Sequence, residues 1–133
     1  MAKAKVTKKT SKKKSPVTTS RAGRLYVTST FNNTIATVTN EKGDAIGWST
    51  AGNAGFKGTR KATPFAATSV VEEALKKARE IGIQSIEVYI KGPGVGRDAA
   101  LRAVRNSGLS ITMIADITPI PHNGPKPKNR RRN

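Results

Sequence analysis

The chain has 133 residues, with 25 Lys or Arg against 8 Asp or Glu, and its formal net charge is +17. This length suits one domain with tails. No apolar run approaches the roughly 20 residues of a membrane span, and no signal-peptide segment is present. The lack of cysteine excludes disulfides, thiolate zinc sites and thiol nucleophiles. We therefore expect a soluble, cytoplasmic protein that needs no metal or other cofactor.

The positive charge is concentrated at the two ends of the chain. Residues 1–24 contain nine Lys or Arg and no acid, residues 117–133 contain five and no acid, and residues 25–116 carry a net charge of only +3. Blocks of like charge need a polyanion to neutralise them. A membrane-binding segment would interleave large apolar residues, and a transit peptide would favour arginine over lysine. We therefore predict a basic arm at residues 1–24 whose partner is a nucleic acid.

The first half of the ordered chain predicts strands. Residues 25–31 alternate apolar and polar side chains, residues 34–40 resume the alternation after Asn32 and Asn33, and residues 45–49 follow a polar turn. Short polar connections join neighbouring antiparallel strands. We expect a three-stranded antiparallel meander.

The second half alternates helices and strands. Apolar residues spaced by three and four predict a helix over 64–81, which Gly82 ends. A strand over 83–91, a helix over 97–107 and a strand over 109–117 follow. The order βββαβαβ predicts an α/β domain at residues 25–117, built on a five-stranded mixed sheet with helices on its faces.

From residue 118 onward the sequence indicates an extended strap. Prolines at 119, 121, 125 and 127 disfavour helix and sheet, and cations follow at Lys126, Lys128 and 130–132. Such a semi-rigid segment lies along a groove at a smaller ordering cost than a flexible tail. Residues 118–133 therefore form a predicted basic C-terminal strap.

The stretch 51–67, AGNAGFKGTRKATPFAA, concentrates glycines and cations before a helix start. Thr63 supplies an N-cap hydroxyl and Pro64 suits the first helical position. A cationic loop at a helix N-terminus favours phosphate. Lys57 precedes Gly58 and Thr59, so the order required of a nucleotide-binding P-loop is absent, and the glycines at 92–96 lack the acid of a dinucleotide site. The loop therefore predicts contact with a nucleic-acid backbone.

No set of residues predicts catalysis. The eight acids have solvating or pairing roles, and the first strand lacks the acid with which a ribonuclease-H-like nuclease holds magnesium. His122 has no visible partner, which favours RNA stacking or hydrogen bonding. Phe31 and Phe65 are predicted core residues. Two roles are possible for Phe56, contact with a base and folding back onto the domain. Two are also possible for Arg97, contact with a phosphate and pairing with Asp98.

The sequence closely resembles the small-subunit ribosomal protein eleven family, in its bacterial or organellar branch. The stretches that carry this resemblance are FNNTIATVTNEKGDAIGWS at 31–49, AGFKGTRKATPFAA at 54–67, GPGVGRDAALRAVRNSGL at 92–109 and DITPIPHNG at 116–124. The resemblance implies a ribonuclease-H-like sandwich in a structural protein of the small-subunit platform. It implies contacts with ribosomal RNA and neighbouring ribosomal proteins, proximity to mRNA near its exit and the Shine-Dalgarno cleft, and a cytoplasmic or organellar ribosome.

Carried over by position, the resemblance implies that Asn32, Asn33, the 55–64 loop, Arg97 and the turn at 122–124 face RNA. Family members usually continue with Cys-Arg after His-Asn-Gly, whereas residues 125–129 read PKPKN here. With the basic tails included, the candidate RNA-binding residues are Lys12, Lys13, Lys14, Arg21, Arg24, Asn32, Asn33, Gly55, Phe56, Lys57, Gly58, Arg60, Lys61, Thr63, Pro64, Arg97, His122, Asn123, Gly124, Lys126, Lys128, Arg130, Arg131 and Arg132.

Two other functions stay open on the sequence. A nucleoid-type protein that binds nucleic acid without sequence preference would have the same charge, and equal affinity for duplex DNA and ribosomal RNA would identify it. A metal-dependent nuclease would depend on Asp98 and Asp116. Separately, Asn123 precedes Gly124, whose bare backbone leaves the asparagine open to deamidation through attack by the next amide.

Overall fold

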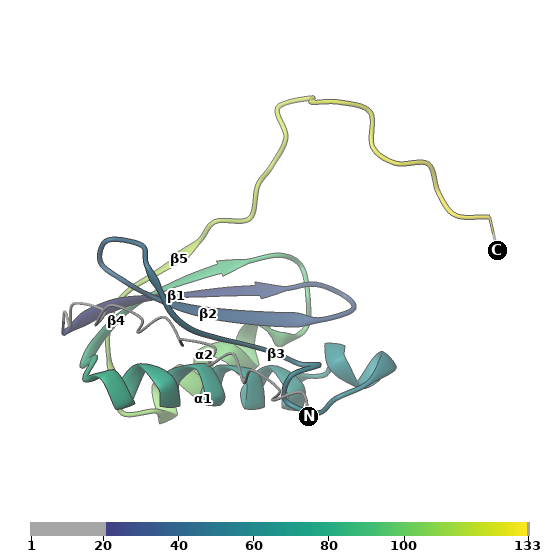
Figure 1. Ribbon diagram of the computed structural model, residues 1–133. Coiled ribbons are helices and arrows are strands. Elements are labelled where there is room, and N and C mark those ends of the chain that lie inside the picture. The colour runs from purple at the N-terminus through teal and green to yellow at the C-terminus, as the bar shows by residue number, and fades with distance from the viewer. Residues whose placement is uncertain (1–20, 133) are drawn as a thin grey trace, which may run out of the picture.

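The computed structural model describes residues 21–132, in which five strands form one mixed sheet in the order β3-β2-β1-β4-β5 (Figure 1). The meander consists of β1 (Ala22–Ser29), β2 (Thr34–Asn40) and β3 (Ala45–Thr50), and both of its pairings are antiparallel. Strands β4 (Ser85–Lys91) and β5 (Ser110–Asp116) continue the sheet in parallel with β1. The mixed sheet and the order βββαβαβ are confirmed, while Lys12, Lys13 and Lys14 lie outside the described residues.

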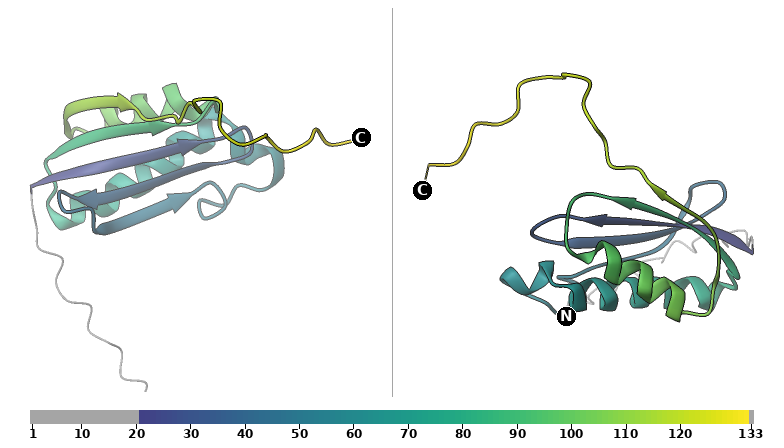
Figure 2. Two further views of the ribbon diagram at one scale, coloured as in Figure 1. Left: turned by 90° about the horizontal axis from the view of Figure 1, so that it is seen from above. Right: turned by 180° about the vertical axis from the view of Figure 1, so that it is seen from behind.

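Helices α1 (Pro64–Ile81) and α2 (Gly96–Asn106) cover one face of the sheet, and a 3₁₀ helix, η1 (Gly58–Ala62), precedes α1 (Figures 1 and 2). The sequence predicted helices on the faces of the sheet without assigning each helix to a face, and the structure places both on the same one. The connections from β3 to β4 and from β4 to β5 both run in the same direction across the sheet. Because such crossovers are right-handed, both place their helices on the same side.

The core lies between this helical layer and the sheet. Leu25 and Val27 alternate with partly exposed residues along β1, as the period of two predicts, and both are buried. The inward face of α1 buries Val70, Val71 and Leu75 at the predicted spacings. On α2 the buried residues are mostly alanine, and such small side chains let the helix approach its neighbours closely.

The opposite face of the sheet carries no helix, and its centre holds an aromatic pair. Tyr26 and Tyr89 stand on paired residues of β1 and β4, and their rings stack at 5.1 Å and 13°. Glu87 accepts hydrogen bonds from Arg24 Nε at 3.2 Å and from the Tyr89 hydroxyl at 3.0 Å. The bond to Glu87, reinforced by desolvation, raises the pKa of Tyr89. Arg24, a candidate RNA-binding residue, is thus held in an ion pair on the open face.

Candidate nucleic-acid interface

One end of the sheet collects most of the candidate residues that belong to the domain. Strands β1, β3, β4 and β5 all finish at this end, and β2 begins there. The helices α1 and α2 also begin there, because each follows a strand that ends there (Figure 1). We call residues 30–33, 51–63, 92–97 and 117–118 the loop end. The topology therefore joins segments that are up to 88 residues apart in sequence.

The turn between β1 and β2 is held by its own hydrogen bonds. The Thr30 N–H donates to the Asn33 carbonyl at 2.8 Å, and Thr30 Oγ1 accepts from the backbone N–H groups of Asn32 and Asn33. Asn33 Oδ1 accepts from the Thr34 N–H at 2.8 Å. Asn32 is exposed, whereas the side-chain oxygen of Asn33 is already hydrogen-bonded within the turn.

This turn also pushes Phe31 outward, and 72% of that residue is exposed. The prediction that Phe31 is a core residue was wrong. Strand β1 ends at Ser29, so the alternation that would have directed Phe31 inward no longer applies two residues later. An asparagine pair directly after an aromatic residue was the available signal for such a turn.

The 51–63 loop folds back on the domain before it reaches η1. Ala51 is buried and its N–H donates to the Thr34 carbonyl at 3.2 Å, while the Phe56 N–H donates to the Ala51 carbonyl at 3.0 Å. Phe56 is partly buried against the core and meets the Phe65 ring edge-to-face at 5.8 Å. Of the two roles left open for Phe56, folding back is the one the structure shows.

Phe65, the second predicted core residue, is 71% exposed, so that prediction was also wrong. On an α-helix, residues separated by four or seven positions share a face. The buried positions of α1 therefore place Phe65 on the outer face, with Ser69 and Glu72. The same helical period that identified the core side of α1 could have assigned Phe65 correctly.

The cations of this loop are available for an external anion. Lys57 and Arg60 are exposed and Lys61 is partly buried, and none of the three forms an ion pair with any acid in residues 21–132. Thr63 caps α1 as predicted: its Oγ1 accepts from the Ala66 N–H at 3.3 Å and donates to the Arg60 carbonyl at 2.7 Å. The cap ties the cationic turn directly to the helix.

The glycine turn between β4 and α2 packs tightly against the end of β1. The Gly94 N–H donates to the Ser29 carbonyl at 2.9 Å. Gly92 has φ of 98°, and a Cβ placed there would lie 2.2 Å from the same carbonyl oxygen. Gly96 is also closely packed, since a Cβ there would lie 2.7 Å from the Ala67 Cβ. The turn therefore requires residues without side chains.

Arg97 is engaged within the chain. Its guanidinium donates to the Gly92 carbonyl at 3.0 Å and pairs with Asp116 at 2.5 Å, so its acidic partner is Asp116 and not Asp98, which was one of the two alternatives for Arg97. Asp116 also accepts from the Thr118 N–H at 3.0 Å and the Thr118 hydroxyl at 2.6 Å. The bonds from Thr118, followed by Arg97, hold the pKa of Asp116 well below its usual range. This network fixes the point at which the C-terminal segment leaves the sheet.

Beyond this point, residues 119–132 contain no helix or strand and extend away from the domain (Figures 1 and 2). His122, Gly124 and all five cations of this segment are exposed. Asn123 has φ of 55°, which marks a local turn. Arg21 is also exposed, but it precedes β1 and therefore lies at the opposite end of the sheet.

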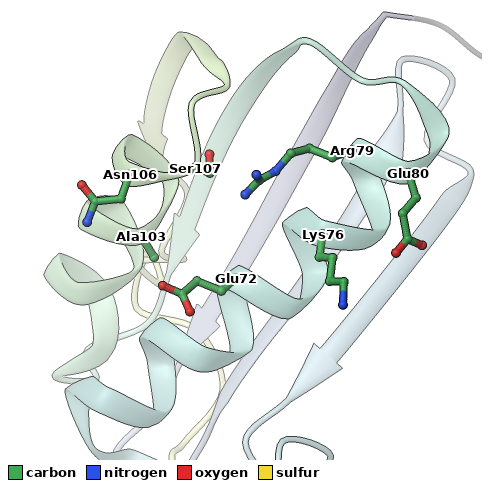
Figure 3. A pocket seen from close by; sticks show the side chains of 7 residues that line it. All are labelled: Glu72, Lys76, Arg79, Glu80, Ala103, Asn106 and Ser107. Carbon is green, nitrogen blue, oxygen red and sulfur yellow. The ribbon is translucent and has the colours of Figure 1, made fainter.

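Another hollow lies away from the loop end, between α1 and α2 (Figure 3). It measures about 640 Å³ and is lined by Glu72, Lys76, Arg79, Glu80, Ala103, Asn106 and Ser107. Glu72 and Arg79 reach from α1 toward α2 in Figure 3. Its two acids offset its two cations, so it offers a polyanion no net attraction, and it contains none of the candidate residues.

Neither a metal-binding cluster nor a membrane-spanning helix is present in residues 21–132. This part of the chain contains no group of three or more His, Asp or Glu side chains placed to hold a metal ion. Neither of its α-helices is both long and apolar enough to cross a membrane.

Comparison with known proteins gave consistent matches. The family model described as Ribosomal protein S11 matches residues 23–132, a range that includes all four stretches on which the resemblance was based. The small ribosomal subunit protein uS11 of Christiangramia forsetii is 52% identical over 124 residues, covering 93% of this chain and 92% of the relative. Those of Caldicellulosiruptor saccharolyticus and Borreliella burgdorferi are each 54% identical over 110 residues, covering 83% of this chain and 85% of the relative.

Proposed function

Because the chain belongs to the ribosomal protein S11 family, a family of small-subunit ribosomal proteins, we propose that it binds small-subunit ribosomal RNA through the loop end and its basic tails. The observation that carries this proposal is the set of cations Lys57, Arg60 and Lys61, none of which forms an ion pair within residues 21–132. Lys61 also lines a hollow together with Asn32. Cations without an internal partner can neutralise RNA phosphates without first breaking an ion pair.

Arg97 has a different part in this proposal. Its guanidinium already binds Asp116 and the Gly92 carbonyl, so it acts mainly by positioning the start of the strap. The strap then carries His122 and five cations away from the domain, where they can follow a groove of the folded RNA. The RNA surface consists of a rigid, preformed part at the loop end and an extended part.

The family resemblance also motivates a location on the subunit platform, near the mRNA exit and the Shine-Dalgarno cleft, with contacts to neighbouring ribosomal proteins. The open sheet face supports a protein contact, since Trp48 is 54% and Ile35 40% exposed there. The three relatives named above are bacterial, which supports a cytoplasmic rather than an organellar ribosome. The role we propose is structural: electrostatic neutralisation and shape complementarity that help fold the RNA.

The salt dependence of RNA binding tests the proposal. If about six cations contact phosphate, the affinity of the full chain for small-subunit ribosomal RNA falls with salt at a log–log slope of about −5. Replacing Lys57, Arg60 and Lys61 together with Gln should reduce the magnitude of this slope by about 2 to 3. Removing residues 118–133 should flatten it further.

A matched control removes the same charge from the helical layer, by replacing Lys76, Arg79 and Arg102 with Gln. These residues are exposed on α1 and α2, outside the loop end. We expect the slope of this control to stay close to that of the wild type. Equal slopes for the two triple variants would show that net charge alone drives binding and would overturn the proposed interface.

Competition and sedimentation separate the alternatives. Co-sedimentation of the tagged chain with small subunits supports the ribosomal role, whereas a free pool alone would contradict it. Equal affinity for duplex DNA and ribosomal RNA would identify a nucleoid-type binder. RNA cleavage that depends on Asp98 and Asp116 would identify a nuclease, although Asp116 already holds Arg97 and Thr118.

A further inference from the structure

A second, smaller hollow lies within the loop end itself. It measures about 370 Å³ and is lined by Phe31, Asn32, Gly58, Thr59 and Lys61. One wall is the turn between β1 and β2, and the other is η1. Three of these five are candidate RNA-binding residues and Thr59 belongs to the 55–64 loop, whereas Phe31 was predicted to lie in the core.

The two walls are held together by the sheet. Ile35 near the start of β2 pairs with Thr50 at the end of β3, and the Ala51 N–H donates to the Thr34 carbonyl at 3.2 Å. The hydrogen bonds of Thr30 and Asn33 stiffen the first wall, and the Thr63 cap fastens the second to α1. The hollow is thus a preformed feature between two braced segments.

Phe31 supplies an aromatic surface that nothing in residues 21–132 uses. It is 72% exposed, does not belong to the core, and forms no ring pair there, whereas the Phe56 and Phe65 rings contact each other. The phenyl ring stands on a braced turn, so its binding loses little conformational freedom.

The polar groups of the hollow are also unpaired. The Asn32 side-chain amide and the Thr59 hydroxyl form no hydrogen bond within residues 21–132, and the Lys61 ammonium forms no ion pair there. No acid lines the hollow. An aromatic face, a donor and acceptor pair and a free cation are therefore grouped in one small space.

We propose that this hollow binds one unstacked nucleobase from a single-stranded loop of RNA. The base stacks on Phe31, its polar edge faces the Asn32 amide, and a flanking phosphate lies against Lys61. Unpaired bases in RNA loops are recognised in this way, by stacking on an aromatic side chain together with hydrogen bonds to the base edge. The inference rests on the proposed function and names the part of the RNA that one portion of the interface receives.

Charge favours RNA over a protein segment as the occupant. Lys57 and Arg60 are next to the lining residues Gly58, Thr59 and Lys61 in the sequence, and none of the three cations forms an ion pair within residues 21–132. A polyanion with exposed aromatic bases complements both the cations and the ring, whereas an apolar peptide would leave the cations without a partner.

Replacing Phe31 with Leu removes the stacking surface but keeps an apolar side chain. In reconstitution of small subunits from ribosomal RNA and the full set of proteins, we expect wild type to outcompete Phe31→Leu by about 5- to 150-fold, the range that corresponds to one stacked base. The salt dependence of incorporation should not change, because Phe31 carries no charge. Phe65→Leu is the matched control, since Phe65 is 71% exposed but lies outside the hollow, and we expect it to compete within about twofold of wild type.

A direct readout identifies the occupant. Zero-length ultraviolet crosslinking of purified small subunits, followed by mass spectrometry, should find a nucleotide joined to Phe31 and none joined to Phe65. Competition by Phe31→Leu equal to wild type, or a Phe31 crosslink to protein in place of RNA, would overturn the base site. Neither result would refute the proposed interface. That proposal fails if the two triple-cation variants have equal salt slopes for RNA binding.

Discussion

Gly92→Ala tests whether the close packing between the β4–α2 turn and β1 organises the loop end. Gly92 has φ of 98°, and its added Cβ would lie 2.2 Å from the Ser29 carbonyl oxygen. Its own N–H donates to Thr118 Oγ1 at 3.1 Å, and its carbonyl accepts from Arg97. The substitution therefore strains the backbone and forces apart the segments that meet at this point.

Two costs combine in this variant. An L-residue in the left-handed region costs about 1–2 kcal/mol. Overpacking a close contact costs about 1–3 kcal/mol more, because the neighbouring atom belongs to the backbone and cannot rotate away. We expect Gly92→Ala to lower the free energy of unfolding by about 2–5 kcal/mol.

Gly43→Ala is the matched control. Gly43 has φ of 95°, close to that of Gly92, but nothing lies within 4 Å of its added Cβ. Gly43→Ala should therefore lower the free energy of unfolding only by the cost of the left-handed backbone conformation, about 1–2 kcal/mol. Urea unfolding of the full chain, followed by far-ultraviolet circular dichroism, measures both variants. Equal losses at Gly92 and Gly43 would refute the packing argument.

Three further predictions follow from local geometry. Asp116→Asn should destabilise the chain at neutral pH and make its stability less sensitive to acid. The pKa of Asp116 is lower in the folded chain than in the unfolded chain, where it is about 3.9, so the carboxylate stabilises the fold above this pH. That stabilisation is lost as the pH falls toward the pKa of the folded chain. Urea midpoints measured from pH 6 to pH 2 check this, and parallel curves for wild type and variant would contradict it. Thr63→Ala should cost about 0.5–2 kcal/mol of unfolding free energy through loss of the α1 cap, which chemical denaturation measures against Thr68→Ala. Asn123 should gain isoaspartate on prolonged ageing, and Gly124→Ala should slow this; intact-peptide mass spectrometry that finds unmodified asparagine would oppose it.

Local features of the sequence were enough to locate the elements. The helix over 64–81 was predicted with the bounds of α1, because its apolar period, the Thr63 cap and the Gly82 stop all act within a few residues. The strand over 34–40 coincides with β2 for the same reason. The other predicted elements differ from the observed ones at one or both ends by one to three residues, because several hydrogen-bonding patterns are close in energy at the end of an element.

The candidate interface was predictable in its chemistry but not in its internal contacts. A cationic, glycine-rich loop before a capped helix was visible in residues 51–67, and the structure places its free cations at the surface. Arg97 was assigned two possible roles from its neighbours in sequence, yet its partner is Asp116, 19 residues away on another strand. Pairing across strands depends on sheet order, which local patterns do not encode.

The sequence by itself therefore determined the class of fold, the positive tails and the family, since composition, period and collinear motifs are properties of the chain read locally. Only the tertiary structure decided that both helices share one face, that Phe31 and Phe65 are exposed, and that four separate segments meet at one end of the sheet. Crossover direction and strand order set these relations, and both arise from contacts between residues that are distant in sequence.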